Sequence, residues 1–151
     1  MKATGTERKM VRKSFRMELV GAGMYESLAK QYQQHEQIGQ KFLRFSGHEA
    51  MHSRLFDEYH RKNYGSRLGG TRVWRGLGKI TAIAMRPLSL EKKVKKICAI
   101  EHQAVHTIET LLSRERDCGL YKIMKRILPD EIEHASLYGE IFLVHENRND
   151  A

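Results

Sequence analysis

Proline is rare in this chain, and its scarcity restricts the fold more than any other feature. Only Pro87 and Pro129 occur among 151 residues, and several glycines gather between residues 65 and 78. Because proline disrupts helix interiors, the remaining stretches are free to form long helices. Apolar residues make up 40% of the chain, which suffices for the core of one domain. The composition therefore predicts an all-α fold.

Apolar residues recur at spacings of three and four in four stretches, the pattern of amphipathic helices. In the first stretch, the stripe runs from Phe15 to Tyr32. The predicted helices cover residues 14–33, residues 36–64, a stretch that begins after Ser89, and residues 120–144.

Helix ends can also be read from single residues. Ser89 suits the N-terminal cap of the third helix, and Gly119, at the end of "SRERDCG", suits its stop. Pro129 lies inside the fourth stretch, where it either kinks the helix or begins a new one.

The connections between these helices have unequal lengths. Residues 65–89 form a long crossover between helices two and three, whereas short turns join the other pairs. This order predicts two antiparallel hairpins joined by a crossover, which is the ferritin-like four-helix bundle. We expect a basic flexible N-terminus over 1–13, a single domain over 14–146 and a tail over 147–151. Neither a membrane span nor a signal peptide is expected.

A Glu-x-x-His motif occurs twice, as Glu49 with His52 and as Glu131 with His134. Both members of the second motif lie 82 residues after those of the first. A shift of 83 residues likewise places "ELVGAGMY" on the region around Glu101. The two halves of the chain therefore resemble a divergent repeat.

Hairpin geometry supports the same grouping, because residues that face each other lie at equal distances from the turn. The midpoint of Glu18 and Glu49 falls at 33.5, and that of Glu101 and Glu131 falls at 116, both within polar runs. Residues at i and i+3 share a helix face, so each histidine lies at the level of its glutamates. The predicted ligands are Glu18, Glu49, His52, Glu101, Glu131 and His134.

Four carboxylates and two imidazoles suit a pair of divalent cations. The carboxylates neutralise four positive charges in a core where either set of charges alone would be costly. This is the ligand pattern of di-iron or di-manganese bundle proteins, so two iron ions are predicted, with manganese as the alternative. Cys98 and Cys118 are isolated thiols outside the pattern and suit a reducing cytoplasm.

Three further residues lie near the predicted site in the helical register. Tyr25 and Tyr138 share faces with the ligands, although core packing explains each tyrosine better than a redox role. His106 lies near the level of Glu101, where a proton-transfer role and a plain polar lining are equally compatible with its position. These three are the candidate catalytic residues.

The segments "ELVGAGMY", "AIEHQAVH" and "DEIEHASL" resemble the ferritin-like di-iron superfamily. Within it the chain is most similar to the demethoxyubiquinone hydroxylases of quinone biosynthesis, over about residues 15–144. The first half of the chain, through "ELVGAGMYESLA" and "HEAMH", resembles the rubrerythrins about as well. The resemblance implies that the six residues bind iron. It also implies an oxygen-dependent monooxygenase that hydroxylates a prenylated quinone at a membrane surface.

Other functions fit the same residues. A rubrerythrin-like peroxidase or ferroxidase needs the same ligands and no large pocket. A di-iron tRNA hydroxylase would account for the net charge of +9, and a metal-free bundle that binds through its basic face is a non-enzymatic alternative. The electron donor and the oligomeric state, including a homo-oligomer, stay open.

The crossover combines apolar and basic residues at helical spacing. Arg72, Trp74, Arg75 and Lys79 lie in a segment that predicts a short amphipathic helix. Such a helix can either lie on an anionic membrane or pack against the bundle. We expect a cytoplasmic protein, and the first of these alternatives would place it peripherally on the inner face of a membrane. Dioxygen or peroxide is the expected oxidant.

Overall fold

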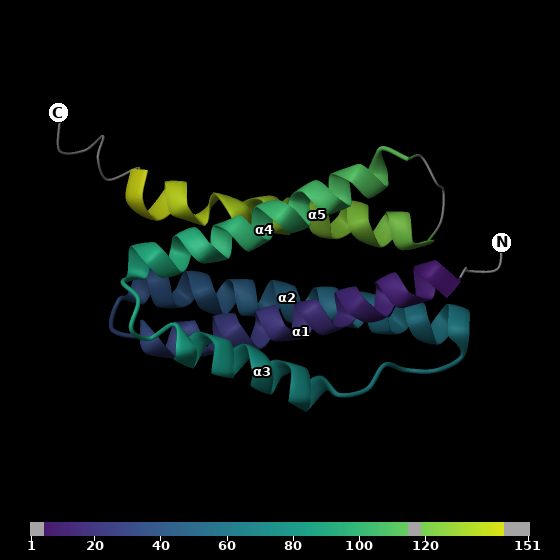
Figure 1. The fold of residues 1–151 in the computed structure, drawn as a ribbon, viewed down its shortest axis with the longest axis horizontal. Helices are drawn as coiled ribbons and strands as arrows, with labels where there is room; N and C mark the ends of the chain where they lie inside the picture. Colours follow the sequence, from purple (N-terminus) through teal and green to yellow (C-terminus); the bar gives the residue numbers. More distant parts are fainter. Residues whose placement is uncertain (1–4, 115–118, 144–151) are drawn as a thin grey trace. The chain divides into compact units, whose positions relative to one another are not determined.

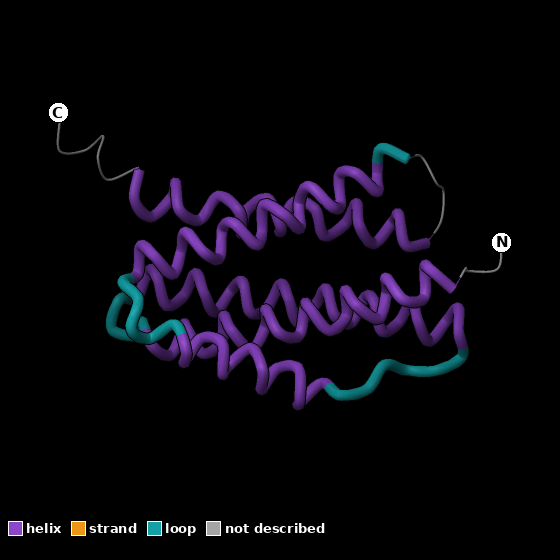
Figure 2. Tube along the Cα trace, viewed as in Figure 1, coloured by secondary structure: helices purple, strands orange, loops and turns teal. Residues whose placement is uncertain are grey.

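The computed structural model describes residues 5–114 and 119–143 (Figure 1). No strand occurs in this part of the chain, which confirms the predicted all-α fold (Figure 2). The α-helices are α1 (Gly5–Gln31), α2 (Glu36–Tyr64), α3 (Thr71–Ala84), α4 (Leu90–Leu112) and α5 (Gly119–Tyr138), followed by a π-helical segment (Gly139–Leu143).

The residue contacts divide the chain into two compact units, Met1–Met85 and Arg86–Ala151. In the first unit, α1 and α2 form an antiparallel hairpin and α3 packs on α1. In the second unit, α4 and α5 form another antiparallel hairpin. The order of hairpin, crossover helix and hairpin is the predicted ferritin-like order. The single domain over 14–146 stays a prediction, and the predicted tail lies outside the described residues.

Helix α1 begins at Gly5, so the predicted start at residue 14 is wrong. The predicted flexible segment is helical from residue 5 onward because side chains of α1 contact α2. Val11 is fully buried, and the Glu7 carboxylate accepts a hydrogen bond from the Tyr59 hydroxyl. Contacts with another helix therefore stabilise a helical turn whose sequence is mostly charged.

Helices α1 and α3 approach each other closely through small residues. A Cβ atom added at Gly23 would overlap the Arg75 carbonyl oxygen, and one added at Gly78 would overlap the Val20 carbonyl oxygen. Gly78 and Ala82 are the buried residues of α3. Glycine is required where two backbones approach this closely, so the crossover helix packs along α1 through its smallest side chains.

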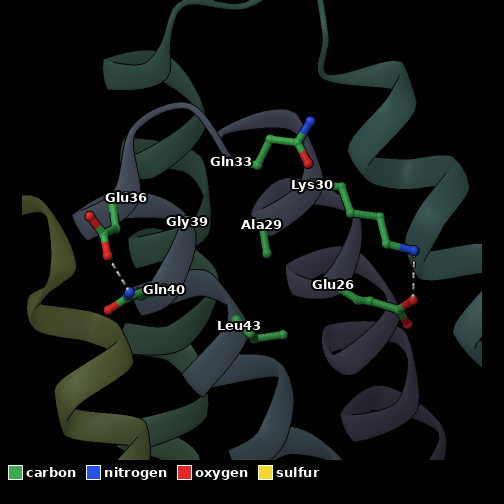
Figure 3. A pocket seen from close by; sticks show the side chains of 8 residues that line it. All are labelled: Glu26, Ala29, Lys30, Gln33, Glu36, Gly39, Gln40 and Leu43. Carbon is green, nitrogen blue, oxygen red and sulfur yellow. Dashed lines mark hydrogen bonds and ion pairs between the residues drawn. The ribbon is translucent and has the colours of Figure 1, made fainter.

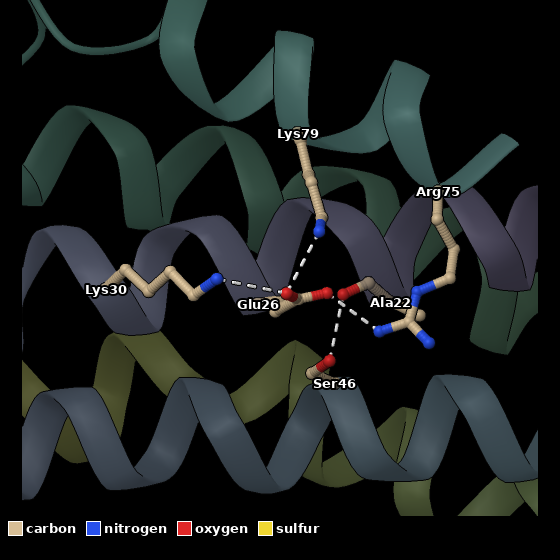
Figure 4. Close-up of polar contacts among 6 residues, drawn as sticks. All are labelled: Ala22, Glu26, Lys30, Ser46, Arg75 and Lys79. Atoms are coloured by element: carbon tan, nitrogen blue, oxygen red, sulfur yellow. Dashed lines mark hydrogen bonds and ion pairs between the residues drawn. The ribbon is translucent and has the colours of Figure 1, made fainter. Parts of the chain in front are cut away.

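A cluster of charges also links α3 to α1. Figure 4 shows Lys30, Arg75 and Lys79 converging on the Glu26 carboxylate, with N–O distances of 3.2, 2.8 and 3.0 Å. The hydrogen bond from Lys79 is the largest cause that lowers the pKa of Glu26, to about 2, with Arg75 and Lys30 adding to it against the effect of burial. Glu26 is therefore ionised at neutral pH and bridges the two helices.

The ends of the second hairpin test three predictions. The Ser89 side chain accepts a hydrogen bond from the Lys92 N–H at 3.3 Å, which confirms the predicted cap of α4. Gly119 is not the end of that helix, because α4 ends at Leu112 and Gly119 begins α5. Helix α5 runs through Pro129, so the alternative in which a new helix begins there is wrong.

No helix among residues 5–114 and 119–143 is long and apolar enough to cross a membrane.

A pocket lies between α1 and α2, near their turn, and Figure 3 shows the side chains that line it. Its volume is about 330 Å³. Glu26, Lys30, Glu36 and Leu43 are among its lining residues, and none of the six predicted metal ligands is.

Candidate metal centre

The first hairpin brings three predicted ligands together. Glu18 comes from α1, whereas Glu49 and His52 come from α2, one helical turn apart. Each offers a ligand atom, and these atoms lie within 4.8 Å of one another. The His52 Nδ1 atom lies 3.3 Å from the Glu18 Oε2 atom. We call these residues the first triad.

The first triad is withdrawn from water. The exposed fractions of Glu18, Glu49 and His52 are 9%, 4% and 0%. An ionised carboxylate loses much of its hydration in such a place, and a bound cation would offset that loss. Two carboxylates and an imidazole therefore form a set of donors that fits a divalent metal ion such as iron or manganese.

Gly21, which was not among the predicted site residues, makes room for the Glu49 carboxylate. A Cβ atom added at Gly21 would lie 2.7 Å from the Glu49 Oε2 atom and 2.8 Å from its carboxylate carbon. Those distances are shorter than van der Waals contact, so a larger residue would displace the carboxylate. Gly21 lies in "ELVGAGMY", three residues after Glu18, but its role depends on where the Glu49 side chain lies.

The second hairpin forms an equivalent second triad. Glu101 comes from α4, and Glu131 and His134 come from α5. Their ligand atoms also lie within 4.8 Å of one another, and their exposed fractions are 7%, 3% and 0%. Each hairpin thus supplies two carboxylates and one imidazole, as the Glu-x-x-His repeat predicts.

Cys98 lies beside the second triad without belonging to it. Its thiol donates a long hydrogen bond to the His134 carbonyl oxygen, with an S–O distance of 3.8 Å. Burial raises the pKa of the Cys98 thiol, and the charge of Glu101 raises it further. A protonated thiol is a poor metal ligand. Cys98 therefore contacts the backbone of His134 but is not a candidate ligand.

The three candidate catalytic residues are placed differently from the ligands. Tyr25 is fully buried, with its ring centre 6.1 Å from that of Phe42 and 5.5 Å from that of Phe45. This is the core packing that the sequence analysis weighed for it. His106 is exposed on α4, where a buried proton-transfer role has no support.

Tyr138 points to the beginning of α4. Its hydroxyl donates to the Glu91 carboxylate at 3.1 Å, and the Lys95 ammonium lies 5.0 Å from its ring centre. Glu91 precedes Glu101 by ten residues, or about 15 Å along a helix. The Tyr138 hydroxyl therefore binds a residue near the beginning of α4 and none of the second triad, contrary to its predicted inward direction.

A family model provides the decisive comparison. The rubrerythrin model matches residues 9–142, which is most of the chain. The chain belongs to the rubrerythrin family. Searches of curated proteins and of solved structures found no match.

The rubrerythrin family is ferritin-like and binds two iron ions, and in this member the carboxylates and histidines of the triads form a possible metal site. The match covers α2, α3, α4 and α5 whole and most of α1, and therefore includes both triads. The resemblance to the ferritin-like superfamily is confirmed, whereas the resemblance to demethoxyubiquinone hydroxylases stays a prediction.

Proposed function

We propose that the two triads bind two iron ions and that the protein is an oxidoreductase that reduces peroxide. The observation that carries the proposal is the matched pair of triads, each buried and each with two carboxylates and one imidazole, in a chain of the rubrerythrin family. The equal offset of 82 residues between the two motifs supports equivalent roles for the two triads.

The chain's own residues hold the ions and exclude water. The four glutamates neutralise the charge of the ions, and the histidines complete the ligand set. Gly21 keeps the volume beside Glu49 open, and the Cys98 thiol contacts the backbone of His134. When bound, the iron pair would supply two electrons to peroxide, which also takes up two protons to form two water molecules. An external reductant must then restore those electrons.

Peroxide consumption by the iron-loaded protein tests this proposal. Anaerobically reduced protein should oxidise about two ferrous ions per molecule of hydrogen peroxide, faster than free ferrous ion does. The double variant Glu49→Ala, His134→Ala removes one ligand from each triad and should abolish this rate. The matched control Glu58→Ala, His102→Ala alters exposed residues of the same types and should keep it. Equal rates for the two variants would contradict the proposal.

One observation favours a second candidate, the hydroxylation of a prenylated quinone. Helix α3 exposes large apolar side chains beside basic ones, which suits a protein that takes its substrate from a membrane. With dioxygen, a reductant and a short-chain prenylated quinone, this candidate predicts a product heavier by one oxygen atom. Peroxide turnover without that product would leave peroxide reduction as the function.

A further inference from the structure

The outer face of α3 is apolar, although it faces solvent. Val73, Leu77, Ile80 and Ile83 have exposed fractions of 63%, 43%, 62% and 47%. In α3, with its steps of 100° per residue, these four side chains share the half of the helix opposite Gly78. We call these four residues the outer face of α3.

The packing of α3 on α1 keeps the outer face of α3 exposed to solvent. Gly78 lies against the backbone of α1, where a Cβ atom would overlap the Val20 carbonyl oxygen. Rotation of α3 by half a turn would bring Ile80 into a space that does not admit a methyl group. The Gln31 side chain also donates to the Ala82 carbonyl oxygen at 3.1 Å. The helix therefore presents its large apolar residues to solvent because its small residues are required on the inside.

Positive charge borders the outer face. Arg72 is exposed, and Arg75 and Lys79 lie on the same edge of the helix with their charged groups bound to Glu26. No aspartate or glutamate occurs in α3. Because Glu26 is bound by three cations, this region carries an excess of positive charge.

Trp74 lies at the opposite border. It is half-buried, and the Arg16 guanidinium lies 5.0 Å from its ring centre. Trp74, Arg75 and Lys79, which were expected to contact a membrane, thus contact side chains of α1. The side chains available to a partner are instead those of the outer face, together with Arg72.

We propose that α3 docks the protein on the surface of an anionic lipid bilayer, with its outer face at the boundary between the lipid headgroups and the acyl chains. An anionic bilayer matches both the apolar residues and their positive border. A second copy of this chain would bring the same cations and a net charge of +9 against them. A nucleic acid would match the charge but leave the apolar side chains in water.

This docking surface is separate from the proposed iron ligands. None of its residues belongs to either triad, so docking needs no metal. Failure of vesicle binding would leave the proposed peroxide chemistry untouched, and failure of iron binding would leave docking untouched.

Cosedimentation with vesicles tests the proposal on the full chain. The wild-type protein should bind phosphatidylglycerol–phosphatidylcholine vesicles, bind pure phosphatidylcholine vesicles less, and bind less as salt rises. Trp74 is the only tryptophan, so its emission should shift when α3 meets the bilayer. Ile80→Glu should weaken binding by roughly 10-fold or more, since it removes apolar contact and adds repulsion.

Leu43→Glu is the matched control. Leu43 is 60% exposed on α2 against 62% for Ile80, and both substitutions exchange one apolar side chain for one negative charge. Leu43→Glu should bind vesicles like the wild type, and Val73→Glu should repeat the loss if Ile80→Glu alters the helix content. Equal vesicle binding by Ile80→Glu and Leu43→Glu would overturn the proposal. So would tRNA binding that outcompetes vesicles, or a dimer in solution that Ile80→Glu dissociates.

Discussion

The positions of the first triad's side chains depend on close contacts between individual atoms. The space that Gly21 leaves open is occupied by the Glu49 carboxylate, and the imidazole of His52 lies beside the Glu18 carboxylate. The grouping of Glu49 with His52 could be predicted, because Glu-x-x-His places both side chains on one helix face. The role of Gly21 could not be predicted. The absence of a Cβ atom matters only because the Glu49 carboxylate occupies that space, and the sequence does not show where this side chain lies.

Gly21→Ala should separate metal binding from folding. The new methyl group would displace the Glu49 carboxylate, so the iron content should fall, while the helix gains up to about 1 kcal/mol of intrinsic propensity. Gly47→Ala is the control, since a Cβ atom at Gly47 meets nothing within 4 Å. Metal analysis and urea unfolding check both variants. Equal iron content in the two variants would contradict the role of Gly21.

At the scale of elements, contacts between helices decide what local sequence does not. The beginning of α4 could be predicted because a serine such as Ser89 suits a helix cap. The end of α2 at Tyr64 agrees with the predicted range, and Gly65 adopts a φ of 75° there. The beginning of α1 could not be predicted, since contacts of Val11 and Glu7 with α2 maintain it. Likewise, the backbone of α1 decides which face of α3 packs inward, because it leaves room only for a glycine at position 78.

The glycine contact between α1 and α3 predicts opposite effects for two neighbouring substitutions. Gly78→Ala should lower the free energy of unfolding by about 1–3 kcal/mol, because its Cβ atom overlaps backbone that cannot move alone. Gly76→Ala should raise it by up to about 1 kcal/mol, because nothing lies within 4 Å of its Cβ position. Thermal unfolding checks both. A stabilised Gly78→Ala variant would refute this packing.

The Glu26 bridge predicts a pH dependence. The pKa of Glu26 is lowered from 4.5 to about 2, so its stabilisation is fully present above about pH 4.5 and is lost as pH falls toward 2. Because its partners are partly exposed, about 1–2 kcal/mol is expected after solvent screening. Glu26→Gln should cost this amount at pH 7, unlike the exposed control Glu58→Gln, and the difference from wild type should shrink on acidification. A difference that is constant between pH 7 and pH 2.5 would argue against the bridge.

For the whole molecule, two hairpins carry equivalent buried triads. The fold order and the grouping of the six candidate ligands could be predicted because periodicity and turn midpoints are properties of the sequence alone, whereas metal binding by these residues stays a prediction. The choice among reactions could not be predicted, because a peroxidase and a hydroxylase share the same ligands. The outer face of α3 could not be predicted either, because its exposure depends on the contact of Gly78 with the backbone of α1.

The iron content after anaerobic reconstitution tests the central claim most directly. Wild-type protein should bind about two iron ions per chain, and so should the control Glu58→Ala, His102→Ala. The variant Glu49→Ala, His134→Ala should lose most of this iron while circular dichroism shows its helices retained. Wild-type protein with fewer than about one iron ion per chain, or a Glu49→Ala, His134→Ala variant that binds as much iron as wild type, would contradict a di-iron centre.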